Sequence, residues 1–136
     1  MIRSSKRLLH RGALLLTVLA LAACAGMQPE KKPAAPAMAD NGALVGPSKM
    51  TLYTFDRDNA GSGKSVCNGP CATNWPPLMV ARAEDKAQGD WSIVLRDDGS
   101  RQWAYKGRPL YYWVKDQKPG DRTGDGVNQV WRTATP

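Results

Sequence analysis

Cys67 and Cys71, two cysteines separated by three residues, form the strongest chemical feature of the sequence. A glycine and a proline bend the chain between them, so the simplest interpretation is a structural disulfide. Two functional alternatives stay open. The pair could cycle as a reversible dithiol, or it could bind Cu(I) with a thioether from Met50 or Met79, because thiolate and thioether ligands suit that soft ion.

Asp121, Thr123 and Asp125 have the spacing of the first oxygen ligands in a calcium-binding loop, and Gly126 follows at the position that needs glycine. The match then fails, because Arg132 stands where such a loop needs a bidentate glutamate. The alternative is that these side chains stabilise turns by accepting bonds from backbone N–H groups. Calcium is therefore a weak candidate, and we expect no cofactor.

All ten aromatic side chains of the chain lie after residue 49, and some of them could form a platform on which a sugar stacks. Trp75 precedes two prolines and Trp131 closes the last aromatic segment, so we expect both to be structural. Trp103 and Tyr112 are the candidates for an outward-facing aromatic surface. A glycan is accordingly one class of ligand that the sequence suggests.

The only histidine, His10, and four of the 19 basic residues lie within the first eleven positions. This stretch has the pattern of a secretion signal, which is removed from the mature protein. What remains has 15 basic against 12 acidic residues and no histidine. The mature chain therefore cannot form histidine-dependent catalytic units or histidine-ligated metal sites, and nucleic acid is not an expected partner.

Residues 1–23 are predicted to be a signal peptide, because a basic stretch precedes an apolar run too short to span a bilayer. The tetrapeptide Leu21-Ala22-Ala23-Cys24 resembles the lipobox of bacterial lipoproteins. The resemblance implies that Cys24 carries lipid and anchors the exported chain in a membrane of the cell envelope. Ala25, where retained lipoproteins have aspartate, implies the outer membrane, facing the periplasm, in a Gram-negative cell.

The rest of the chain divides into a tether and one domain. Residues 24–48 are rich in proline and alanine and predict a tether. Residues 49–136 are expected to form a small, mainly β domain with at most a short helix. The expected elements are strands within 50–55 and 110–114, a hairpin over 91–105 with its aromatic side chains on one face, and a short helix over 81–88.

An internal repeat organises the domain. The pattern Leu-Tyr-x-aromatic-x-basic-Asp occurs twice, 58 residues apart (111 minus 53). Its copies contain Tyr53, Phe55 and Asp58, and Tyr111, Trp113 and Asp116. Each copy leads to a tryptophan, which predicts two tandem repeats, about 49–78 and about 107–134, that pair around a shared core.

These motifs resemble the bacterial secreted-repeat lipoproteins, predicted lipoproteins that share a Tyr-x-(Phe/Trp/Tyr)-x-x-Asp motif and have no known function. Segments 63–78 and 119–128 extend the resemblance across most of the domain. We therefore expect a membrane-anchored envelope lipoprotein that is a non-enzymatic binding or structural module, with an envelope protein or glycan as partner. The alternative is a periplasmic lipoprotein that uses Cys67 and Cys71 for thiol redox chemistry or Cu(I) handling. The sequence does not indicate an oligomeric state.

Overall fold

The computed structural model describes residues 34–136. The predicted signal peptide (1–23), the predicted lipidation site Cys24 and the first part of the tether lie outside the described residues. Across residues 34–136, no helix has the length and apolar character needed to cross a membrane. Short strands predominate and there is one short α-helix, which confirms the prediction of a mainly β domain.

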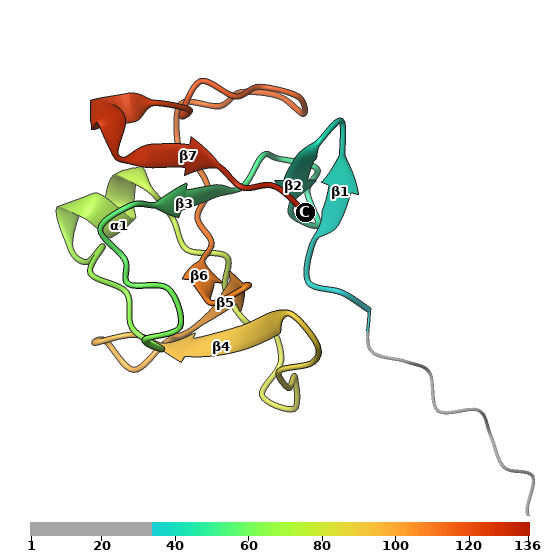
Figure 1. Cartoon of the computed structure of the whole chain (residues 1–136), viewed down its shortest axis with the longest axis vertical. Helices are drawn as coiled ribbons and strands as arrows, with labels where there is room; N and C mark the ends of the chain where they lie inside the picture. Colours follow the sequence, from blue (N-terminus) through green and yellow to red (C-terminus); the bar gives the residue numbers. More distant parts are fainter. Residues whose placement is uncertain (1–33) are drawn as a thin grey trace, which may run out of the picture. The chain divides into compact units, whose positions relative to one another are not determined.

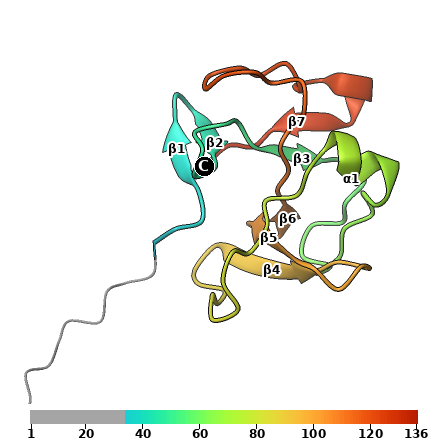
Figure 2. The same cartoon turned by 180° about the vertical axis from the view of Figure 1, so that it is seen from behind.

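The strands of the described residues form three small antiparallel sheets, in which β1 pairs with β2, β3 with β7, and β5 lies between β4 and β6. The elements are β1 (Met38–Asp40), β2 (Ala43–Val45), β3 (Tyr53–Phe55), α1 (Pro70–Asn74), β4 (Trp91–Leu95), β5 (Arg101–Tyr105), β6 (Arg108–Pro109), a 3-10 turn (Val127–Gln129) and β7 (Trp131–Thr133). In Figures 1 and 2, β3 and β7 lie side by side at one end of the domain, and β4 lies at the other.

The folded domain begins before the predicted boundary at residue 49. Strands β1 and β2 form a hairpin whose turn, Asn41-Gly42, has φ angles of 46° and 78°, as expected for the Asn-Gly turns of two-residue hairpins. All three residues of β2 are buried. The assignment of residues 38–48 to the tether was therefore wrong, because β2 contributes apolar side chains to the core.

The two repeats exchange strands. β3 comes from the first repeat and pairs with β7 at the end of the second, with Phe55 opposite Trp131. In the second repeat, Tyr111 bridges to Pro77 at the end of the first. The two halves also meet directly, because the backbones of Tyr53 and Tyr111 exchange reciprocal hydrogen bonds of 2.8 and 3.0 Å. The β3–β7 sheet therefore takes one strand from each repeat.

Two rings of backbone hydrogen bonds show the same exchange. In each ring, three segments meet, and each N–H donates to the carbonyl of the next residue. The first ring runs through Leu44, Ala134 and Leu52 at 2.8–2.9 Å, and the second through Trp103, Leu78 and Leu110 at 2.8–3.0 Å. The side chains of these six residues, with Ala37, form one buried core cluster. Each ring joins both predicted repeats, through Leu52 and Ala134 in the first ring and through Leu78 and Leu110 in the second, whereas Leu44 and Trp103 lie outside the predicted bounds.

The hairpin formed by β4 and β5 agrees with the sequence prediction. Trp91 pairs with Tyr105 and Ile93 with Trp103, so the aromatic side chains share one face of the sheet. The helix predicted over 81–88 is absent, and this segment is a loop whose carbonyls at Ala83 and Asp85 accept bonds from Arg101. The helix lies instead at 70–74, where Pro70 occupies its first turn.

Candidate functional site

The repeated Tyr and Asp residues form crossed pairs between the two repeats. The Tyr53 hydroxyl donates to Asp116 Oδ2 at 2.6 Å, and the Tyr111 hydroxyl donates to Asp58 Oδ2 at 2.5 Å. Both tyrosines are fully buried and both aspartates are nearly so. Each repeat therefore supplies the tyrosine for one pair and the aspartate for the other.

The second oxygen of each aspartate holds the loop that follows it. Asp58 Oδ1 accepts the Val66 amide at 2.8 Å, and Asp116 Oδ1 accepts the amide and hydroxyl of Thr123 at 3.0 and 2.6 Å. Burial raises the pKa of Asp58. Burial also raises the pKa of Tyr53 and of Tyr111 far above its ordinary value, and the hydrogen bond that each tyrosine makes to an aspartate raises it further. The phenols therefore remain protonated donors at neutral pH, and each pair links the two repeats by a buried hydrogen bond.

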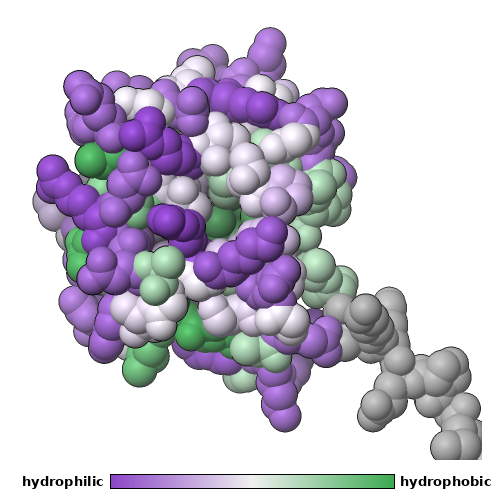
Figure 3. Space-filling model, viewed as in Figure 1, coloured by the Kyte–Doolittle hydropathy of each residue, from purple (hydrophilic) through white to green (hydrophobic). Residues whose placement is uncertain are grey.

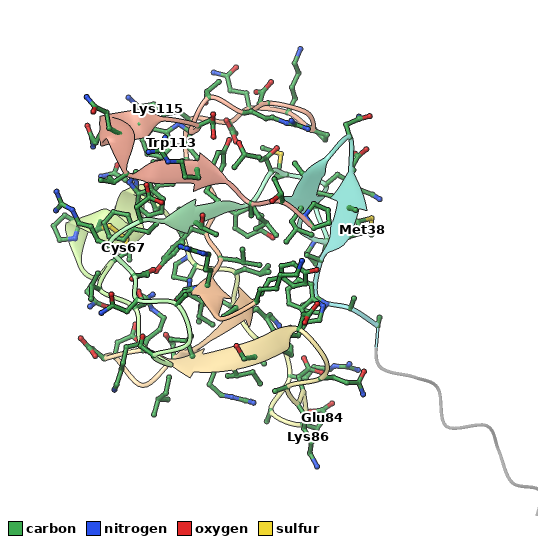
Figure 4. All side chains as sticks on the ribbon, in the orientation of Figure 1. Met38, Cys67, Glu84, Lys86, Trp113 and Lys115 are labelled. Atoms are coloured by element: carbon green, nitrogen blue, oxygen red, sulfur yellow. A yellow bond between two sulfur atoms is a disulfide. The ribbon has the colours of Figure 1, made fainter. Side chains whose placement is uncertain are left out.

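Four aromatic rings from both repeats form a continuous stack between the crossed pairs. Trp75 and Trp131 occupy its centre with ring centroids 3.7 Å apart and planes inclined by 6°. Phe55 stacks on Trp131 at 4.3 Å and Trp113 on Trp75 at 4.0 Å. The prediction that Trp75 and Trp131 are structural agrees with their burial. Trp113 forms the partly exposed end of the stack, with Lys115 Nζ 5.6 Å from its centroid (Figure 4).

Cys67 and Cys71 form a disulfide across the start of α1, with Cα atoms 5.2 Å apart. Cys67 is fully buried beside the aromatic stack, and Cys71 is only partly buried (Figure 4). Residues 34–136 contain no cluster of three or more His, Cys, Asp or Glu residues that could hold an ion. The two cysteines are thus paired with each other, as the simplest interpretation of the sequence predicts.

A buried arginine reinforces the cysteine loop. The Arg96 guanidinium donates to Cys67 O at 2.6 Å, Ser65 Oγ at 3.0 Å and Gln102 Oε1 at 2.7 Å. It also donates to Asn68 Oδ1 at 3.2 Å. Sequence analysis did not identify this residue, because a single arginine next to a turn resembles any exposed charge.

The three calcium candidates each bond within the protein. Asp121 Oδ2 accepts the amides of residues 117 and 118, Asp125 Oδ1 accepts the Thr133 amide at 2.7 Å, and Thr123 bonds to Asp116. The Thr133 amide also holds the pKa of Asp125 below its ordinary value. The structure thus shows these side chains stabilising turns and loop ends, as the alternative interpretation stated.

The candidate aromatic surface does not form as predicted. Trp103 is only 7% exposed and belongs to the core cluster, because residues 37 and 78 cover the face of the hairpin on which it lies. Tyr112 is half-buried beside Gly46, and burial raises the pKa of its hydroxyl. Trp103 and Tyr112 therefore do not form a shared outer platform.

A groove of about 790 Å³ lies on the aromatic face of the β4–β5 hairpin. Its floor includes Trp91 and Tyr105, which are half-buried and have ring centroids 4.9 Å apart, and the nearly buried Trp103. One wall is the loop over residues 81–90, whose tip carries Glu84 and Lys86 (Figure 4), and the other is residues 34–36 with Pro47. The volume and the mainly apolar lining are typical of a ligand site.

Four charged side chains line the groove: Arg82, Asp85, Lys86 and Asp90. Sequence analysis missed them because the loop has no motif and no periodicity. The hairpin pattern did predict that Trp91 and Tyr105 share a face, and this was the available signal. The face in Figure 3 is hydrophilic over most of its area, with apolar residues in separate spots.

The comparison with known families agrees with the predicted resemblance. A family model described as a secreted repeat of unknown function matches residues 37–79 and again residues 92–135. Both matches begin earlier than the repeats predicted from the Tyr-Asp motif, and they include the two hairpins β1–β2 and β4–β5. No curated protein and no solved structure matches the chain.

Proposed function

Because the chain belongs to this family of secreted repeats, we propose that it is an exported, lipid-anchored module of the bacterial cell envelope that binds its partner in the groove. Export is what the family description states. The lipid anchor at Cys24 rests on the resemblance of residues 21–24 to a lipobox. Placement in the outer membrane, facing the periplasm, rests on Ala25 and applies to a Gram-negative cell.

The observation that carries the binding function is the groove itself. Ligand sites are concave, mostly apolar and provided with a few polar groups that fix orientation, and the groove has each of these properties. The side chains of the crossed Tyr-Asp pairs and of the aromatic stack bond to and pack against one another in the core. Their role is to hold the two repeats together, which leaves the groove as the surface for recognition.

The early start of the domain limits how far the groove can stand from the membrane. Ala34, which lies at the edge of the groove, is ten positions after Cys24 in the chain. A fully extended chain of that length spans about 35 Å. A lipid on Cys24 would therefore keep the groove within about that distance of the bilayer surface, and its partner must be accessible there.

Site-specific photo-crosslinking in living cells tests the binding function. A photoreactive residue at Lys86, at the tip of the groove loop, should capture a defined envelope component. The same residue at Lys118, an exposed position outside the groove, is the matched control. A crosslinked species at both positions or at neither would contradict a partner bound in the groove.

A separate experiment tests the anchor. Metabolic labelling with palmitate should mark the wild-type chain and not the Cys24→Ser variant, and the wild-type chain should fractionate with the outer membrane of a Gram-negative host. Equal labelling of both chains would show that Cys24 is not the lipidation site.

A further inference from the structure

We propose that the groove takes a neutral polysaccharide chain, with a sugar ring stacked on Trp91. This inference rests on the proposed binding function and adds the chemical class of the ligand. Three features of the groove support it: the aromatic pair on its floor, the balance of its charges, and the rigidity of its loop.

The aromatic pair offers flat apolar surface beside polar groups. Trp91 and Tyr105 are a cross-strand pair on one face of the hairpin, and both remain partly exposed although they contact the core. Their rings are tilted by 50° to each other, so the two surfaces do not cover each other by stacking. A sugar ring has an apolar face of C–H groups and an edge of hydroxyls, and it matches an aromatic floor with a polar rim.

The charges lining the groove cancel. Arg82 and Lys86 oppose Asp85 and Asp90, two positive against two negative side chains. A groove without net charge does not attract an anionic lipid or a nucleic acid, because attraction of polyanions requires an excess of one sign. The same four side chains provide both donors and acceptors, which the hydroxyl and amide groups of a neutral sugar can use.

The loop that carries these groups is held in place before any ligand binds. Arg101 donates to Ala83 O at 3.0 Å and to Asp85 O at 2.8 Å. Arg82 contacts Asp85 Oδ1 at 3.0–3.2 Å, which fixes the two side chains relative to each other. Groups that are already positioned lose less conformational entropy on binding, so a weakly interacting ligand such as a sugar can still be recognised.

Isothermal titration of the mature chain from residue 25, exported without lipid, tests the proposal. The probes are a soluble tetramer of β-1,4-linked N-acetylglucosamine and a cellulose-derived tetramer, with co-sedimentation on insoluble chitin and cellulose as a second assay. We expect at least one probe to bind, and Trp91→Ala to weaken that binding about tenfold or more, as truncation of a central aromatic does at binding sites.

Arg82→Ala is the second groove variant, because its exposed side chain can be removed without disturbing the core. Arg108→Ala, an exposed arginine outside the groove, is its matched control. The proposal expects Arg82→Ala to weaken sugar binding and Arg108→Ala to leave it unchanged. Thermal melting of each variant separates loss of binding from loss of folding.

The outcomes distinguish this inference from the proposed function. Failure of every polysaccharide probe, together with a protein or peptide captured at Lys86, would overturn the sugar ligand and leave the binding function intact. Sugar binding that is equal in wild type, Trp91→Ala and Arg82→Ala would place the sugar outside the groove and would also overturn the inference. Failure of all probes together with no crosslink at Lys86 would overturn both.

Discussion

The two repeats share one frame but hold their loops differently. In both, an aspartate accepts the tyrosine of the other repeat and bonds to the loop seven or eight residues later. The loop of the first repeat is held in addition by the disulfide and by the buried Arg96, which belongs to the second repeat and donates to residues 65–68. Within residues 34–136, the loop after Asp116 in the second repeat has no disulfide and no bond from Arg96, and Thr123 binds its aspartate directly.

This difference distinguishes the contacts that both repeats share from the contacts that hold only the loop of the first repeat. The crossed pairs and the aromatic stack occur in equivalent positions of both repeats, so they explain how the two halves assemble. Arg96 follows β4, the strand that forms part of the groove floor, and so it connects the loop of the first repeat to that hairpin. The hydrogen bonds of Arg96 therefore lie between the core of the domain and the hairpin that carries the proposed binding site.

The largest expected effect on stability comes from removing a central ring of the aromatic stack, to which both repeats contribute. Trp75→Ala and Trp131→Ala should each lower the free energy of unfolding by about 3–5 kcal/mol, because each removes a buried ring from the centre of the stack. That is a large share of the total stability of a small domain. Urea unfolding of the mature chain measures the loss, and Leu95→Ala, at an exposed apolar residue outside the stack, is the control. A small loss for one central tryptophan and a large loss for the other would show that the repeats are not equivalent.

Arg96→Met should loosen the loop of the first repeat and leave the corresponding loop of the second unchanged. The substitution leaves four acceptors without their donor, among them Cys67 O and Gln102 Oε1, and we expect a loss of about 3 kcal/mol. Hydrogen exchange should accelerate for amides 59–68 and stay unchanged for amides 117–124. Arg108→Met is the matched control. Equal acceleration in both loops would contradict a role confined to the first repeat.

The double variant Cys67→Ser/Cys71→Ser should have a smaller effect. A disulfide that closes so short a loop stabilises by about 2 kcal/mol on the chain-entropy argument, and reduction of the wild-type chain should cost the same. Thiol titration with and without reductant, together with metal analysis, completes the test. Thiols that titrate near the redox poise of the envelope, or copper that copurifies in stoichiometric amount, would instead support the thiol-redox or Cu(I) alternative.

The repeat and the strands could be predicted from the sequence, but which strands and which side chains pair with one another could not. The spacing of Tyr53 and Asp58 and of their copies indicated a duplication, because local pattern survives in each copy. Which tyrosine meets which aspartate depends on strand exchange between the repeats, and no local pattern encodes that. The Asn41-Gly42 turn signal for β1–β2 was present, but the surrounding prolines and alanines suggested a tether.

The candidate site was less predictable than the fold. A two-residue period showed that Trp91, Trp103 and Tyr105 share a face, but not which part of that face the rest of the chain covers. Segments distant in sequence bury Trp103 and leave Trp91 partly open. No local sequence motif predicts where the charged residues of the loop over 81–90 lie. The loop is held by hydrogen bonds from Arg101, which is distant in sequence, and not by local secondary structure.

The smallest expected effect compares two aspartates by their pH dependence. Burial raises the pKa of Asp58, so the stability linked to its proton is present below the ordinary pKa near 3.9 and is lost as the pH rises through the folded value. The Thr133 amide lowers the pKa of Asp125, so its contribution is present above the ordinary pKa and is lost as the pH falls through the folded value. Asp58→Asn should therefore lower the melting temperature more at pH 3 than at pH 7, and Asp125→Asn more at pH 7. Thermal melts from pH 2 to pH 7 measure both differences against wild type, and a shift in the same direction for both variants would contradict the opposite environments of the two carboxylates.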